Sequence, residues 1–126
     1  MLIRIISSVI ISIILFQSLV VAPIANIELP AEGSSVFLRC IWPIFFFIIG
    51  ILSLANLFME CKHKYNLLVN VTTVVFMILC YFLVTPINYA LDNGEMTVWK
   101  ALHMLTICLT MIVLILHLIF IFKWYK

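Results

Sequence analysis

The chain has 126 residues, of which 67% are apolar and only 10% are charged, and its mean hydropathy is +1.33. A soluble domain carries about 25% charged residues, so this composition excludes a water-soluble globule and predicts one integral membrane domain surrounded by a lipid bilayer. The net charge of +2 is small and the basic residues form no solvated cluster, so nucleic acid is not expected as a partner.

Four apolar stretches are long enough to cross a bilayer as helices, which takes about 20 residues each. The predicted helices are 3–22, 36–59, 67–91 and 97–122, joined by outer loops 23–35 and 92–96 and by an inner loop 60–66. Pro23 is expected to begin the first outer loop, and Asn93-Gly94 is a turn signal for the second. Because short links place successive helices side by side, the sequence predicts an all-α, antiparallel four-helix transmembrane bundle covering residues 1–126.

The basic residues predict how this bundle is oriented. With both termini in the cytoplasm, the inner side holds Arg4, Lys62, Lys64, Lys123 and Lys126. The outer side then holds only two basic residues, Arg39 and Lys100. Since cytoplasmic segments carry an excess of lysine and arginine, the sequence predicts a multi-pass protein with both its N-terminus and its C-terminus inside (N-in/C-in).

Polar residues of the fourth predicted helix fall on one stripe when they are placed at about 100° per residue. Trp99, Thr106, Thr110 and His117 lie within an arc of roughly 60° that includes His103, and apolar side chains cover the rest of the helix. A polar side chain inside a membrane needs a partner, so this stripe is expected to face protein or water and not lipid.

The third and second predicted helices carry similar stripes. On the third helix the stripe consists of Asn70, Thr73, Met77, Tyr81 and Asn88. On the second helix it consists of Arg39, Gly50, Ser53 and Glu60, with Asn56 outside its edge. The polar residues of the first helix are scattered around it: Ser7, Ser8, Ser12 and Gln17. We therefore expect three helices to share a polar seam, and the first helix to be mostly a filler or lipid-facing.

His103 is the centre of a candidate ligand-binding site at the outer side. At that depth it could meet Asn88, Arg39 or Gln17, and Trp99 lies one helical turn away on the same face. The alternative, which the pattern favours slightly, is a neutral histidine hydrogen-bonded within the seam.

His117 belongs to a separate, inner region. It lies 14 residues from His103, about 21 Å along the helix axis, so the two histidines cannot ligate one metal ion or one haem. Together with His63 and Cys61 of the inner loop, His117 offers donors for a soft divalent metal ion, although the spacing is not that of a strong zinc site. A hydrogen-bonded histidine in the seam is the favoured interpretation here too.

Two stretches resemble a known family. They are FQSLVVAPIANIELPAEGSSVFLRCIWPIFF (16–46) and TPINYALDNGEMTVWKALHMLT (85–106). The first is similar to the opening hairpin of four-span bacterial membrane proteins that carry domain of unknown function 4149 and are related to eukaryotic transmembrane protein 205. The second, with Pro86, Asn88, Trp99, Leu102 and His103, resembles that family's second hairpin and, more distantly, the anthrone-oxygenase-like proteins. The resemblance implies four helices in a bacterial inner (cytoplasmic) membrane and implies no established reaction.

Three functions follow from these residues. The favoured one is a non-enzymatic bundle, either an accessory subunit that packs against partner membrane subunits or a second copy of itself, or a binder of a small ligand. The first alternative is a redox or oxygenase-like enzyme that acts on a hydrophobic substrate or quinone beside His103 and Asn88, with haem or a metal as the cofactors to consider. The second alternative is a transporter of a metal or small solute, which is disfavoured because no carboxylate lies in the middle of a predicted helix.

Overall fold

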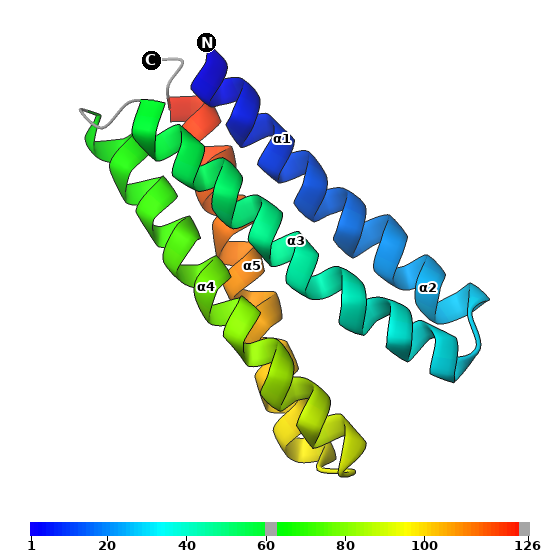
Figure 1. Ribbon diagram of the computed structural model, residues 1–126. Helices are drawn as coiled ribbons and strands as arrows, with labels where there is room; N and C mark the ends of the chain where they lie inside the picture. Colours follow the sequence, from blue (N-terminus) through cyan, green and yellow to red (C-terminus); the bar gives the residue numbers. More distant parts are fainter. Residues whose placement is uncertain (60–62, 124–126) are drawn as a thin grey trace.

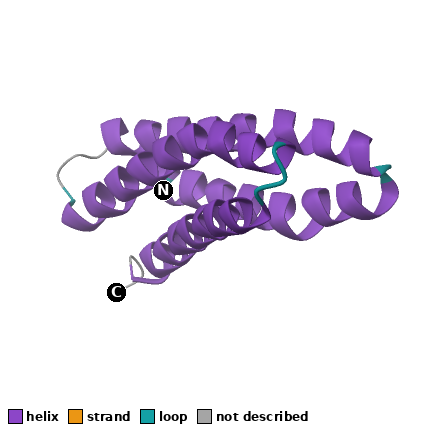
Figure 2. Ribbon diagram, turned by 90° about the horizontal axis from the view of Figure 1, so that it is seen from below, coloured by secondary structure: helices purple, strands orange, loops and turns teal. Residues whose placement is uncertain are grey.

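The computed structural model describes residues 1–59 and 63–123, and they form an all-α antiparallel four-helix bundle (Figure 1). The first long segment is made of α1 (Leu2–Phe16), the π-helical η1 (Gln17–Val21) and α2 (Ala22–Glu28). The others are α3 (Ala31–Met59), α4 (Lys64–Asp92) and α5 (Met96–Lys123). Figure 2 shows how short the described connections between the helices are.

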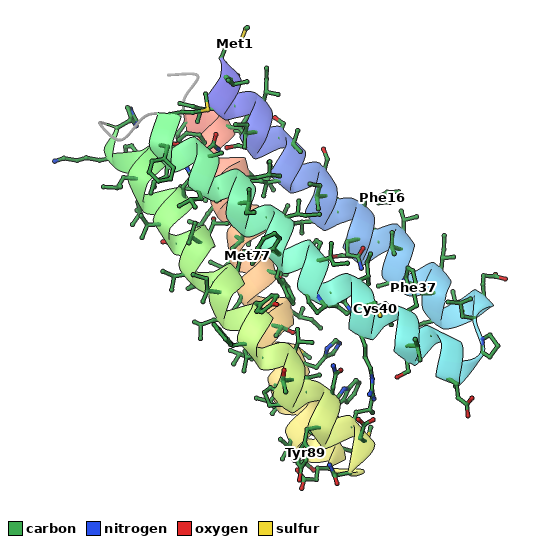
Figure 3. All side chains as sticks on the ribbon, in the orientation of Figure 1. Met1, Phe16, Phe37, Cys40, Met77 and Tyr89 are labelled. Carbon is green, nitrogen blue, oxygen red and sulfur yellow. The ribbon has the colours of Figure 1, made fainter. Side chains whose placement is uncertain are left out.

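The four segments are long and apolar enough to cross a membrane, with lengths of 27 to 29 residues. At 1.5 Å per residue each is about 40 Å long, more than the hydrocarbon core of about 30 Å. Large apolar side chains cover the outer surface of the bundle: Phe16 is 60% exposed and Tyr89 64% exposed, and both point outward in Figure 3. Met77, only 1% exposed, lies between the helices. This distribution fits a bundle surrounded by lipid.

The predicted outer loop 23–35 is wrong in its extent. The first segment stays helical through Pro23 to Glu28. Proline has no N–H and its ring crowds the carbonyl of the preceding turn, which normally ends a helix. Here the turn before it widens into a π-helical turn, in which the N–H of Ala22 bonds to the carbonyl of Gln17, and the helix continues past the proline.

The break comes instead at Leu29 and Pro30. Leu29 is extended (φ −94°, ψ 144°), the conformation that a following proline favours. The other helices also begin earlier than predicted, at residues 31, 64 and 96 in place of 36, 67 and 97. Of the predicted inner loop 60–66, residues 64–66 are therefore helical and residues 60–62 lie outside the described residues.

The second outer connection is close to the prediction. Asp92 ends α4 and Met96 begins α5, so only three residues lie between them. Gly94 has φ +72°, which L side chains rarely adopt, and the Asn93 side chain donates a hydrogen bond to the Tyr89 carbonyl at 2.8 Å. This confirms the Asn-Gly turn signal in the sequence.

The bundle is closed at one end and open at the other. α3 packs along α4, α4 packs along α5, and α1 contacts both α3 and α5. Among the described residues α2 contacts α3 but neither α4 nor α5. The chain thus forms two hairpins, one from α1 to α3 and one of α4 and α5, which diverge in Figure 1 toward the connections at 28–31 and 92–96. We call this the splayed end, and the end with the N-terminus the narrow end.

Candidate functional site

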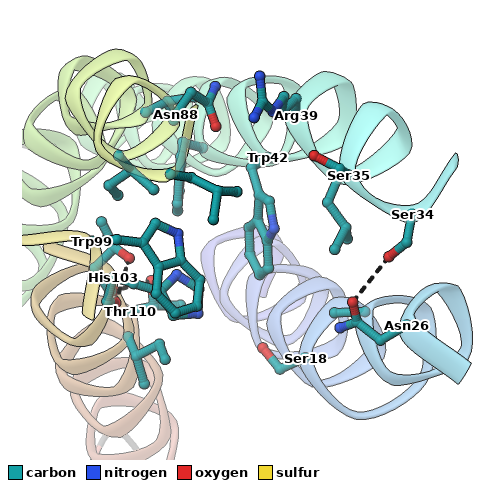
Figure 4. Close-up of a pocket in the computed structure, with 18 of the residues that line it drawn as sticks. Ser18, Asn26, Ser34, Ser35, Arg39, Trp42, Asn88, Trp99, His103 and Thr110 are labelled. Atoms are coloured by element: carbon teal, nitrogen blue, oxygen red, sulfur yellow. Dashed lines mark hydrogen bonds between the residues drawn. The ribbon is translucent and has the colours of Figure 1, made fainter. Parts of the chain in front are cut away.

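A cavity of about 650 Å³ lies between the two hairpins at the splayed end (Figure 4). Its wall includes residues from η1, α2, α3, α4 and α5. The structure brings all four predicted ligand-binding candidates to this wall, namely Arg39, Asn88, Trp99 and His103. Gln17, considered as a partner of His103, is buried and does not line the cavity.

Trp99 and His103 form one face of the cavity. They lie one turn apart on α5, and their rings stack with centroids 5.1 Å apart and an interplanar angle of 9°. Among the described residues the imidazole forms no hydrogen bond, while the backbone carbonyl of His103 accepts one from Thr106 Oγ1 at 2.8 Å. The predicted alternative was a His103 side chain hydrogen-bonded within the seam, and the described residues offer no partner for such a bond.

Trp42 forms the facing wall and was not predicted as a site residue. Its ring stacks on Phe46 (centroids 5.8 Å apart, 25°) and meets Phe45 edge-on (5.3 Å, 89°), which fixes its orientation. Figure 4 shows Trp42 projecting from α3 into the space opposite Trp99 and His103. The sequence held a signal for it, because Trp42 is three residues after Arg39 and therefore shares its helix face.

Arg39 is held by Asp92, a partner that was not predicted from the sequence. The guanidinium Nη1 donates to Asp92 Oδ2 at 3.0 Å, and Nη2 pairs with the other carboxylate oxygen. Such a fork-to-fork pair fixes the planes of both groups. It joins α3 to the end of α4 across 53 residues of sequence, beside the cavity mouth. Asn88 also lines the cavity, one turn before Asp92, and makes no hydrogen bond with another described residue.

A second polar region lies toward the narrow end and includes His117, one of the predicted metal-ligand candidates. Its members are each 0% exposed: Ser7, Ser53, Asn56, Asn66, Asn70, Thr73 and His117. They come from α1, α3, α4 and α5, so the seam joins four helices and not three. We call this set the polar cluster.

Hydrogen bonds run through the polar cluster from helix to helix. Asn56 Nδ2 donates to Ser7 Oγ at 3.3 Å, and Asn66 Nδ2 donates to the Asn56 carbonyl at 3.2 Å. Asn70 Nδ2 donates to Asn66 Oδ1 at 2.8 Å and its own Oδ1 accepts from Ser53 Oγ at 3.1 Å. Apart from Asn56 Oδ1, which has no partner among the described residues, these bonds satisfy amide groups that would be costly to leave unpaired in lipid.

Two sequence expectations about polar faces are wrong. Tyr81, expected on the inner stripe of its helix, is 46% exposed. Ser7, on the helix expected to be mostly a filler or lipid-facing, is 0% exposed and belongs to the polar cluster. Asn56 is 0% exposed although its angle lies outside the stripe of its helix. Asn66 was missed because it was assigned to the loop 60–66. Angles on an isolated helix show which residues share a face, but the neighbouring helices decide which faces are covered.

The inner metal hypothesis is not supported by the positions of its histidines. His117 Nε2 lies 3.1 Å from Thr73 Oγ1, whose hydroxyl also donates to the Val69 carbonyl at 2.8 Å. His63 directly precedes α4, and Thr73 lies ten residues after it, about 15 Å along the helix axis. This is too far for His63 and His117 to share one ion. Cys61 lies outside the described residues, and those that are described contain no group of three metal-ligating side chains.

An apolar layer separates the cavity from the polar cluster. It consists of Ile10, Ile14, Phe45, Phe46, Ile49, Met77, Cys80 and Val113, all buried. On α3, α4 and α5 these residues fall between the cavity and the cluster, and Phe46 forms the boundary because it also lines the cavity. The bundle is thus built in three layers, with the cavity closed at its inner end.

Comparison of the chain with models of known families, with curated proteins and with solved structures finds no match.

Proposed function

We propose that this protein is a small membrane bundle that binds a lipid-soluble amphiphile in the cavity at its splayed end. The observation that carries the proposal is the cavity itself, whose volume of about 650 Å³ is that of a small-molecule site. Its wall is mainly apolar and carries a few polar groups close together, which is the composition typical of such sites. The orientation expected from the basic residues would place the cavity in the outer half of the membrane.

Binding is better supported than passage through the membrane. The buried apolar layer, with Ile49 and Val113 each 0% exposed, lies between the cavity and the narrow end. A polar solute would have to cross this layer and then break the hydrogen bonds of the polar cluster. A transporter would need a polar path or an ionisable group at this depth.

Binding is also better supported than catalysis. Among the described residues of the wall, only His103 has a side chain whose ordinary ionisation lies near neutral pH. No carboxylate lines the cavity in the described part of the chain, and no described side chain orients the His103 ring through a hydrogen bond. General acid–base chemistry normally relies on such an arrangement.

The proposal can be tested by filling the cavity. Ser35 lines the cavity on α3, whereas Ser8 is exposed on α1 away from it, so Ser35→Phe and Ser8→Phe form a matched pair. Each variant is purified in lipid nanodiscs, and the small molecules that remain bound are extracted and identified by mass spectrometry. We expect a compound that copurifies in a fixed ratio with the wild type and with Ser8→Phe but is lost from Ser35→Phe.

The outcomes of this purification also distinguish a ligand-binding bundle from an accessory subunit. If the same compounds are recovered from both variants, the cavity does not bind the ligand and the proposal fails. Copurification of a protein partner in a fixed ratio, with no bound small molecule, would favour the accessory-subunit alternative. The resemblance to four-span bacterial proteins is compatible with either outcome, since it implies no reaction.

A further inference from the structure

The cavity wall has an unusual balance of charge. Arg39 is the one charged side chain among the described residues that line it. The carboxylate of Asp92 accepts from both terminal nitrogens of this guanidinium, so the positive charge is already compensated within the protein. A ligand in the cavity therefore meets a mainly apolar wall whose few polar groups carry no net charge.

Several polar groups of the wall can only donate a hydrogen bond, and they have no partner among the described residues. Arg39 Nε is buried and makes no hydrogen bond with a described residue. The indole N–H groups of Trp42 and Trp99 also lack partners among the described residues, as does the amide of Asn88, which can both donate and accept. An indole or guanidinium N–H can only donate, so a ligand that satisfies these groups must offer acceptors. Figure 4 shows these side chains grouped around one part of the space.

We infer that the cavity selects an uncharged headgroup that carries hydrogen-bond acceptors, such as an ester, ketone or ether, attached to an apolar chain or ring. The inference rests on the proposed function and adds the chemical class of the ligand. A carboxylate would lose its hydration on entering and would find the charge of Arg39 already compensated by Asp92, so the neutral donors of the wall would offset only part of that loss. An ammonium group would meet unsatisfied donors, the Arg39 cation and no free carboxylate.

Asp92 is thereby a specificity residue, although it does not line the cavity. In an Asp92→Asn variant the guanidinium keeps its position on α3 but loses its counter-charge. The cavity then gains a net positive charge, and a carboxylate ligand becomes its natural partner. Glu95→Gln is the matched control, because Glu95 is an exposed acid on the same turn that makes no ion pair with Arg39.

The experiment uses three probes with one brominated chain: methyl dibromostearate, dibromostearate and dibromostearylamine. Bromine quenches indole fluorescence on contact, and Trp42 and Trp99 both lie on the cavity wall. Replacing the third tryptophan with Trp124→Phe leaves the signal to these two residues. Quenching of the full chain in nanodiscs is titrated at a pH at which the carboxylate and the amine are both charged.

In the Trp124→Phe background, the methyl ester should give saturable quenching at a concentration at least about tenfold lower than either charged probe, a difference of 1.4 kcal/mol. In the Asp92→Asn variant, the carboxylate probe should quench at the same concentration as the ester or at a lower one. Glu95→Gln should leave the order of the three probes unchanged. The double variant Arg39→Gln/Asp92→Asn makes the wall neutral again and should restore the preference for the ester, even if Asp92→Asn alone folds poorly.

The possible results separate the two proposals. If quenching is saturable and Ser35→Phe abolishes it, the cavity binds the probes and the proposed function stands. If the wild type then shows no preference among the probes, or prefers a charged one, the headgroup inference is overturned. An Asp92→Asn variant that folds and keeps the wild-type ranking also overturns it. Unsaturable quenching that Ser35→Phe does not change refutes the proposed function itself.

Discussion

Replacing Asn70 by leucine tests how much the hydrogen bonds of the polar cluster contribute to the stability of the bundle. Leucine has the same branched shape as asparagine, so the substitution removes hydrogen bonds without changing the packing volume much. Asn70 Nδ2 donates to the Asn66 carbonyl at 2.9 Å and to Asn66 Oδ1 at 2.8 Å, and Asn70 Oδ1 accepts from Ser53 Oγ at 3.1 Å. All three residues are 0% exposed, so water cannot replace the lost partners.

The expected magnitude follows from these three bonds. Only the Ser53–Asn70 bond joins two helices, and such a bond contributes about 0.6 kcal/mol in membrane proteins. The two bonds to Asn66 lie within α4; counted at the same value, they bring the expected loss in the free energy of unfolding for Asn70→Leu to about 2 kcal/mol. The new leucine brings little compensation, because burying an apolar group away from lipid has no hydrophobic driving force. Ser53→Ala removes only one of the bonds and should cost about 0.6 kcal/mol.

The assay is unfolding in mixed micelles by titration with dodecyl sulfate, followed by far-ultraviolet circular dichroism. Because both substitutions remove the same Ser53–Asn70 bond, the double variant should cost about 0.6 kcal/mol less than the sum of the single changes. Ser8→Ala, on the exposed face of α1, is the control and should leave stability unchanged. A cost below about 0.5 kcal/mol for Asn70→Leu, within the error of additivity, would refute the role given to the cluster.

Two further predictions concern the turns and the orientation. Gly94→Ala should cost about 1–2 kcal/mol because φ is +72° there. Gly50→Ala should change the free energy of unfolding by less than about 0.5 kcal/mol, because its new Cβ would lie 3.6 Å from Met77 Cβ, an ordinary contact. Equal effects of Gly94→Ala and Gly50→Ala in the same unfolding assay would contradict this prediction. In a cysteine-free background, a membrane-impermeant maleimide added to whole cells should label Glu95→Cys and spare Lys64→Cys until the cells are opened. The reverse pattern would refute the N-in/C-in prediction.

The sequence by itself determined that the chain forms four long apolar helices, because only a helix satisfies every backbone group of an apolar segment in lipid. It also determined the inner face of α5. Thr106, Thr110 and His117 recur on one side of the helix and are 6%, 5% and 0% exposed in the bundle. A polar group in lipid has few alternatives to facing a protein neighbour, so this prediction required no knowledge of that neighbour.

Local competition and tertiary contacts decided other features. Pro23 is a strong signal for a helix end, yet the π-helical turn before it allows α2 to continue to Glu28. Tyr81 shared a face with polar residues but lies 46% exposed, because a tyrosine can meet lipid with its ring. Neither outcome is contained in the spacing of residues along one helix.

The cavity depended on the tertiary structure alone. The depth of each residue in the membrane was enough to propose His103, Asn88 and Arg39 as neighbours. The tertiary structure was needed to show that Trp42 faces them and that Arg39 pairs with Asp92. The physical reason is that lipid is as apolar as the helix surfaces, so apolar burial does not fix the angle between two hairpins. The polar cluster holds them together at the narrow end, and where those hydrogen bonds stop, the hairpins diverge and leave the space that we propose a ligand fills.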